Sequence, residues 1–243
     1  MTHYLTRAVL DRQAPEHALR PLLDPTDRTA TLDAHRRLMW TLFPGRDAKR
    51  DFLWRADGKG KFLVVSTRKP QCSRLFKPLE SKPYAPVLAV GDRLAFVLRA
   101  NATKDRRSGP GGGVVSGNGR KPRRDRRVDI VMHTMQEHGL RGRIAGSNSR
   151  AARRMEIADE AARSWIASQG DRHGFQVEFD TFAVEDYRVS KFKRRDGGQA
   201  TFGVLDLKGL LTVRDPKMFT SMLFSGLGRA RAFGCGLMLV RRT

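Results

Sequence analysis

The stretch LDAHRRLMWTLFP, residues 32–44, decides the fold. Asp33 can cap a helix, and Pro44 followed by Gly45 would end one. Between them the apolar residues recur at helical spacing, which predicts an amphipathic helix. Runs of strand length that are rich in β-branched and aromatic residues precede and follow this helix, at 4–10 (YLTRAVL), 51–57 (DFLWRAD) and 61–67 (KFLVVST). The predicted order is therefore β-α-β-β.

The rest of the chain continues this order and then repeats it. A turn of helix at 72–76 and an extended run at 83–90 would complete β-α-β-β-α-β, the ferredoxin-like, or RRM-like, order. A second round is predicted from elements at 92–101 (strand), 156–169 (helix), 175–184 (strand), 187–213 (hairpin turning at 196–198), 215–224 (helix) and 236–240 (strand). We therefore expect an α+β protein of two tandem ferredoxin-like domains, at 1–90 and 91–243.

A basic insertion interrupts the second round. Residues 102–127 (ATKDRRSGPGGGVVSGNGRKPRRDRR) are rich in Gly, Ser and Arg and cannot bury a core. A short amphipathic helix is predicted at 128–138, and polar sequence punctuated by glycine follows it. We take the insertion to span about 102–154 and to present a positively charged surface.

The net charge of the chain is strongly positive. Lys and Arg number 47 against 25 Asp and Glu, which gives a formal charge of +22. Such a surface favours a polyanionic partner such as nucleic acid. Of the basic residues, 35 are arginines, whose planar guanidinium group pairs with phosphate through two parallel hydrogen bonds.

Two basic features could contact that partner. The predicted hairpin has a cluster of basic residues at or beside its tip, namely Lys191, Lys193, Arg194 and Arg195. The glycine-rich loop GLGRARAFGCG, residues 226–236, carries Arg229 and Arg231 among Gly226, Gly228, Gly234 and Gly236. Because this loop follows a helix and precedes a strand, it is not the phosphate loop of nucleotide-binding folds. Each feature either contacts an RNA backbone or is structural, as a solvated hairpin edge and a helix-to-strand connection.

Membrane-spanning and metal-binding signals are absent from the sequence. No apolar run approaches the roughly 20 residues that span a bilayer, and the N-terminal residues lack a signal-peptide pattern. We therefore expect a cytoplasmic protein with no membrane partner. Cys72 and Cys235 have neither C-x-x-C spacing nor neighbouring histidines, and the histidines lack metal-ligand spacing. We expect no metal and no cofactor.

His35 is the residue of the helix at 32–44 that has two readings. It shares a helical face with Met39 and Leu42, and by spacing alone such a histidine is more often part of the core. Its ordinary pKa near 6.5 also suits RNA cleavage, in which one group takes the proton of a ribose 2′-OH and another protonates the leaving 5′-oxygen. Glu178 and Asp180 could instead serve a two-metal nuclease, although an exposed strand face explains them as well.

Several stretches, in the same order, resemble the CRISPR-associated repeat-processing endoribonucleases of the type I-E Cascade complex, the CasE family. They are HRRLMWTLFPGRDAKRDFLW (35–54), FVLRAN (96–101), FGVLDLKGLLTV (202–213) and GLGRARAFGCGLMLV (226–240). The resemblance implies tandem ferredoxin-like domains and a metal-independent endoribonuclease. Its substrate would be the CRISPR repeat stem-loop in precursor RNA, cut at the 3′ base of the stem by attack of a 2′-OH. The mature guide RNA would stay bound within Cascade, whose other subunits would be partners.

The resemblance also implies roles for particular residues. His35 matches the catalytic histidine of the family, and basic groups of the C-terminal domain would grip the hairpin. The expected RNA-binding residues are Arg36, Arg37, Lys191, Lys193, Arg194, Arg195, Arg229 and Arg231. Some members carry a tyrosine where this chain has Leu32, so the second catalytic group is open, with Tyr4, Arg36 and Arg37 as candidates. The alternative function is a catalytically inactive scaffold subunit of the same fold that binds the RNA hairpin.

Overall fold

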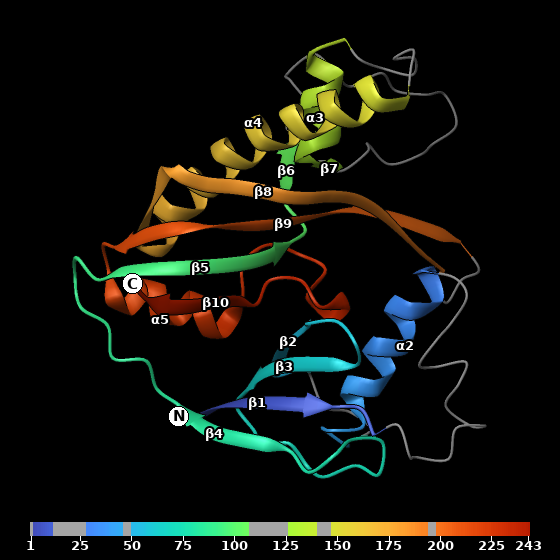
Figure 1. Cartoon of the computed structure of the whole chain (residues 1–243), viewed down its shortest axis with the longest axis vertical. Helices are drawn as coiled ribbons and strands as arrows, with labels where there is room; N and C mark the ends of the chain where they lie inside the picture. The colour runs from blue at the N-terminus through green and yellow to red at the C-terminus, as the bar shows by residue number, and fades with distance from the viewer. Residues whose placement is uncertain (1, 12–27, 46–49, 107–125, 140–146, 194–197) are drawn as a thin grey trace, which may run out of the picture.

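The computed structural model describes residues 2–11, 28–45, 50–106, 126–139, 147–193 and 198–243. These residues include two four-stranded antiparallel sheets that lie one above the other in Figure 1. The strand orders are β2-β3-β1-β4 and β10-β5-β9-β8. If the four strands of each sheet are numbered along the chain, both sheets read 4-1-3-2. The prediction of an α+β protein with two ferredoxin-like sheets is confirmed.

The first sheet packs against the helix that begins the pattern. Its strands are β1 (His3–Val9), β2 (Phe52–Ala56), β3 (Lys61–Ser66) and β4 (Glu80–Tyr84), and α2 (Arg28–Trp40) precedes β2. The apolar residues at helical spacing, Leu38, Met39, Leu42 and Phe43, are buried together with Trp54 and Phe62 of the sheet. The N-cap prediction is wrong, because α2 begins five residues before Asp33. The Asp33 carboxylate instead binds Arg36 and Arg37 one turn further on.

Two predictions in the first domain differ from the structure between β3 and β4. The turn of helix expected at 72–76 is a single hydrogen-bonded turn, in which the Phe76 N–H donates to the Ser73 carbonyl at 3.0 Å. The strand expected at 83–90 lies at 80–84, where it pairs with β1 in a register that joins His3 to Tyr84. Pro86 follows and has no N–H to continue the ladder, so the apolar run beyond it connects the sheets instead.

The second sheet holds the larger core. Its strands are β5 (Arg93–Ala100), β8 (Phe175–Lys193), β9 (Gln199–Val213) and β10 (Met238–Arg242), with α4 (Ser147–His173) and α5 (Pro216–Ser225). The helix predicted at 215–224 is α5, and Asp215 caps it by accepting from two backbone N–H groups. β8 is one long strand, because the two segments predicted separately are joined through irregular pairing between Glu178 and Asp186.

The ends of the predicted insertion are structured. β6 (Thr103–Arg106) pairs with β7 (Arg126–Asp129), and α3 (Ile130–Glu137) follows, capped by the Asp129 carboxylate. α3 buries Ile130 and Val131 in the core of the second sheet. Residues 107–125 lie outside the described residues. In Figure 1, α3 and α4 lie beyond the second sheet, on the side away from the first.

The two sheets meet through a small apolar cluster built on Leu53, Val65 and Leu237. α2 extends from the first sheet toward the far ends of β8 and β9 (Figure 1). The short 3-10 helix η1 (Arg231–Phe233) lies within the glycine-rich loop.

The boundary between domains at residues 90 and 91 stays a prediction. No helix in the described ranges has the length and apolar composition that a bilayer crossing requires.

Candidate active site

His35 lies at the edge of the first core. It projects from α2, and its ring packs edge-on against Phe62 of β3, at 5.0 Å between ring centroids, and against Trp54 of β2, at 6.2 Å. Burial lowers the pKa of His35, because a charged imidazolium loses hydration there. The neutral imidazole is therefore favoured near neutral pH, and this is the form that can accept a proton.

The exposed side of His35 opens into a pocket between the two sheets. The pocket has a volume of about 370 Å³, and both halves of the chain line it. The first half contributes Thr31, Leu32, His35, Trp54 and Ala56, and the second contributes Arg99, Asp186, Arg188, Ser190, Val204, Phe233, Gly234 and Cys235. Burial raises the pKa of Cys235 to about 12, so its thiol stays protonated. The groups with charge in this pocket are thus two arginines and one aspartate, beside a titratable histidine.

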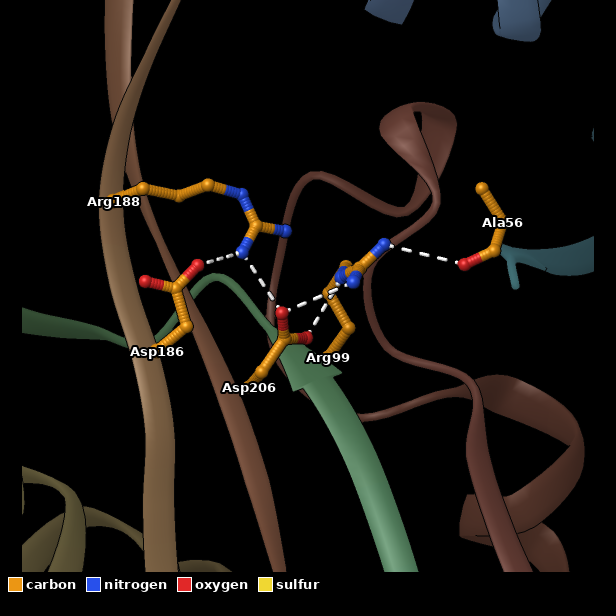
Figure 2. A network of polar contacts seen from close by, with 5 residues as sticks. All are labelled: Ala56, Arg99, Asp186, Arg188 and Asp206. Atoms are coloured by element: carbon orange, nitrogen blue, oxygen red, sulfur yellow. Dashed lines mark hydrogen bonds and ion pairs between the residues drawn. The ribbon is translucent and has the colours of Figure 1, made fainter. Parts of the chain in front are cut away.

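The two arginines share one buried carboxylate, as Figure 2 shows. Asp206 of β9 accepts from Arg99 Nε at 2.7 Å and from Arg99 Nη2 at 3.0 Å, in a bidentate pair. Arg188 Nη1 donates to the same carboxylate at 2.8 Å and also to Asp186. Burial raises the pKa of Asp206, but hydrogen bonds and charges from Arg99 and Arg188 outweigh it, so the net shift is downward. The carboxylate stays ionised.

Arg188 keeps part of its donor capacity. Its Nη1 makes both carboxylate contacts, whereas no hydrogen bond joins Nε or Nη2 to any residue in the described part of the chain. Arg99, by contrast, uses Nε and Nη2 on Asp206 and directs Nη1 to the Ala56 carbonyl at 3.4 Å. Arg188 therefore keeps more donors available to an incoming anion than Arg99 does, including its whole Nη2 group.

The structure does not place the other candidates for the second catalytic group in this pocket. Arg36 and Arg37 bind Asp33 at 2.7 Å and 2.6 Å, and neither lines the pocket. Tyr4 lies in β1 opposite Ser66 and does not line it either. Leu32, which stands at the position of the family tyrosine, does line it.

The glycine-rich loop joins the pocket to a neighbouring groove. Gly226, Gly228, Gly234 and Gly236 all have positive φ. At Gly234, which has φ 79°, a Cβ atom would lie 2.9 Å from the Trp54 ring, so only glycine fits beneath the indole that supports His35. Arg229 and Arg231 line the groove with Arg127 and His173. The pKa of Arg50 is lowered by burial and by the charge of Arg231, which marks a site of crowded positive charge.

The hairpin predicted to grip RNA is only partly described. Lys191 is exposed near the end of β8. Lys193 belongs to β8, but its side chain, like Arg194 and Arg195, lies outside the described residues. The roles of these residues stay predictions.

The acidic pair considered for a metal site is engaged otherwise. Both carboxylate oxygens of Glu178 bind Arg93, each at 2.7 Å. Within the described ranges, no three His, Cys, Asp or Glu side chains are grouped so that they could hold a metal ion.

Sequence reasoning missed Arg99, Asp186, Arg188 and Asp206. A signal for two of them was present, because Arg99 and Asp206 each interrupt an apolar strand, FVLRAN and GVLDLKG. A charged residue in such a strand needs a buried partner, and the two lie opposite each other in the β5–β9 register. The fold and this site together define a protein of two ferredoxin-like sheets with a cationic pocket at their junction.

Comparisons with known proteins agree with the fold. A family model described as CRISPR associated protein matches residues 3–242. A solved CRISPR endoribonuclease Cse3 bound to a 19-nucleotide RNA has a TM-score of 0.64 and 21% identity, covering 99% of each chain. Thermus thermophilus Cse3, bound to an RNA representing a pre-cleavage complex, has a TM-score of 0.61 and 19% identity, covering 99% of this chain and 100% of that one. Cas6e from Escherichia coli has a TM-score of 0.53 and 19% identity over the same shares.

The chain belongs to this family of CRISPR-associated proteins, because the family model spans nearly its whole length. The resemblance drawn from the sequence is thereby confirmed. The likeness to the solved Cse3 and Cas6e structures, at 19% to 21% identity, establishes the fold. No curated protein matches the chain.

Proposed function

We propose that the protein is a metal-independent endoribonuclease of the CasE type, which binds the CRISPR repeat stem-loop in precursor RNA and cuts at the 3′ base of the stem. The observation that carries this proposal is the pocket in which a neutral His35 and a partly free Arg188 line the same cavity. The fold shared with Cse3 proteins that bind RNA supports it.

The chemistry follows from the two groups. His35, as the neutral imidazole, takes the proton of the 2′-OH beside the scissile phosphate. The 2′-oxygen then attacks the phosphorus, and the bond to the 5′-oxygen breaks. The leaving 5′-oxygen takes up a proton from water, so the products are a 2′,3′-cyclic phosphate and a 5′-hydroxyl. Arg188, through Nε and Nη2, would bind the non-bridging oxygens, where negative charge grows in the transition state. Arg188 thus fills the place of the unassigned second group, as a charge-stabilising residue.

RNA binding would extend from this pocket along the basic surface. Arg229 and Arg231 line the neighbouring groove. The helix η1 lies between the two cavities, because its Phe233 lines the pocket and its Arg231 lines the groove. We propose that these residues, with Lys191, Lys193, Arg194 and Arg195, contact the phosphate backbone of the stem. Arg36 and Arg37 would act in the same way at the outer side of α2, if RNA displaces Asp33 from them.

The partners follow from the same proposal. A chain of this fold, with a TM-score of 0.56 and 17% identity, occurs in a solved CRISPR RNA-guided surveillance complex. We propose that this protein keeps its mature guide RNA and joins a Cascade complex through it, in the cytoplasm. The division into an N-terminal domain with His35 and a C-terminal RNA-gripping domain at residues 90 and 91 belongs to this proposal.

Cleavage in a chelator tests the proposed function. The protein should cut a repeat stem-loop RNA at one position in EDTA, and at the same rate in Mg²⁺, because His35 and Arg188 need no metal. The products, separated on a denaturing gel, should carry a cyclic phosphate and a 5′-hydroxyl. Binding without cutting in either buffer would favour the inactive scaffold, and cutting in Mg²⁺ alone would favour a metal-dependent nuclease. Glu178→Gln serves as the control for the latter.

A further inference from the structure

Asp206 is the buried carboxylate at the centre of the arginine network. Only 8% of its surface is exposed, and it accepts three hydrogen bonds from two guanidinium groups. It does not itself line the pocket that contains His35. Figure 2 shows Asp206 between Arg188 and Arg99, bonded to both. Because it does not line the pocket, it would touch the arginines and not the RNA.

The surrounding charges make this carboxylate necessary. Arg55 of β2 lies nearby with Nε and Nη1 buried and without a hydrogen-bond partner among the described residues. Burial lowers the pKa of Arg55, and the charge of Arg99 lowers it further, whereas Asp206 acts in the opposite direction. Without Asp206, Arg99 and Arg188 would lose the carboxylate that they share, and half-exposed Asp186 would be the remaining carboxylate bonded to Arg188.

The network also connects the two sheets. Arg99, held by Asp206, donates to the carbonyl of Ala56 at the end of β2. β2 carries Trp54, against which the His35 ring packs. Asp206 therefore bonds to Arg188 directly, and it is linked through Arg99 to β2, the strand that supports His35. The distance between Arg188 and His35, which line opposite sides of the pocket, depends on both of these links.

We infer that Asp206 is a positioning residue for RNA cleavage, which holds the guanidinium of Arg188 toward the pocket so that Nε and Nη2 meet the scissile phosphate. The inference rests on the proposed function. Arg188 is a long side chain with several rotatable bonds, and Nη1 bonded to a fixed, buried carboxylate leaves the opposite side of its fork directed outward. Asp206 acts through Arg188 and makes no contact with the RNA.

Asp206→Asn tests this role by keeping the shape and removing the charge. With protein in excess over a repeat stem-loop RNA, the single-turnover rate should fall about 100-fold, the effect typical of a misplaced catalytic group. The Kd for the RNA should be unchanged or lower, because the variant loses a negative charge. A role limited to stability would instead lower the melting temperature and leave the rate of the folded protein intact.

A double-mutant cycle separates action through Arg188 from an independent effect. If Asp206 works through Arg188, the double variant with Arg188→Ala should be no slower than Arg188→Ala alone. Asp206→Glu retains the charge and moves the carboxylate by one methylene, so it should fold and still cut slowly. Glu178→Gln, which breaks the bidentate pair with Arg93 at another part of the sheet, is the matched control and should cut at the wild-type rate.

Each outcome has one meaning. Suppose that the wild type cuts the RNA. Full activity of both Asp206→Asn and Asp206→Glu would then overturn the positioning role and leave the proposed function intact. So would a rate for the double variant of Asp206 and Arg188→Ala that is reduced by the product of the two single losses. Wild-type protein that binds the RNA and does not cut it would overturn the proposed function and, with it, this role.

Discussion

His35→Ala should cut a repeat stem-loop RNA about 10² to 10⁴ times more slowly than the wild type, which is the usual contribution of a general acid or base. In the proposed mechanism the neutral imidazole of His35, which lines the pocket, accepts the proton of the 2′-OH, and alanine cannot take its place. The Kd for the RNA should change little, since His35 is not part of the basic surface. The measurement is a single-turnover time course in EDTA, with a gel-shift titration beside it.

The control for His35 is another histidine outside the pocket. His138 is exposed beside α3, and its Nε2 lies 3.3 Å from Glu160. His138→Ala should cut as fast as the wild type. Equal rates for His35→Ala and the wild type would exclude a catalytic role and return His35 to the reading that spacing alone favours, a histidine at the edge of the core.

The second large effect is expected at Arg188. Arg188→Ala should lower the single-turnover rate by about 10² to 10³, the loss that follows removal of one donor to a developing oxyanion. Arg188→Lys should recover only part of the rate, because a lysine lacks the planar fork that presents two donors to phosphate. Both variants should be measured with protein in saturating excess, so that weaker RNA binding does not enter the rate.

Arg93→Ala is the matched control for Arg188. Arg93 lies in the same sheet and also pairs with a carboxylate, but it is far along β5 from Arg99 and does not line the pocket. Its loss removes one positive charge without touching the site, so the rate should not change. A wild-type rate for Arg188→Ala would contradict the assignment of Arg188 and of its positioning residue Asp206 together.

Local pattern was sufficient to predict most strands of the two sheets and the helix that carries His35, but not β6, β7 or the single turn at 73–76. The helical period of Leu38, Met39 and Leu42 and the strand runs around it gave the β-α-β-β order, because both depend on neighbours within a few residues. The first and last residues of the elements were predicted less well where local signals compete. Asp33 has the chemistry of a cap, yet the helix starts earlier and uses that carboxylate for Arg36 and Arg37. The position of β4 is set by its pairing with β1 and not by the apolar run at 86–90.

The site could be predicted only in part. His35 was selected by resemblance to a family, since its spacing alone favoured the core. Arg188 was missed because two distant residues distinguish it from the other arginines. One is Asp206, 18 residues away on the neighbouring strand, and the other is His35, which packs against the other sheet. Such contacts depend on the packing of the two sheets. Asp206, an acid between two leucines, and Arg99 in FVLRAN are the two positions of this site at which the sequence carried a signal for a buried ion pair.

A single 2′-deoxy substitution in the RNA tests internal attack by the 2′-OH most directly. The substrate is the repeat stem-loop with deoxyribose at the nucleotide just upstream of the cut, and the control carries deoxyribose one nucleotide further away. The wild-type protein in EDTA should bind both with equal affinity and cut only the control, because the attacking oxygen is missing from the other. Cleavage of the substituted RNA at the same phosphate would contradict transesterification by His35 and Arg188.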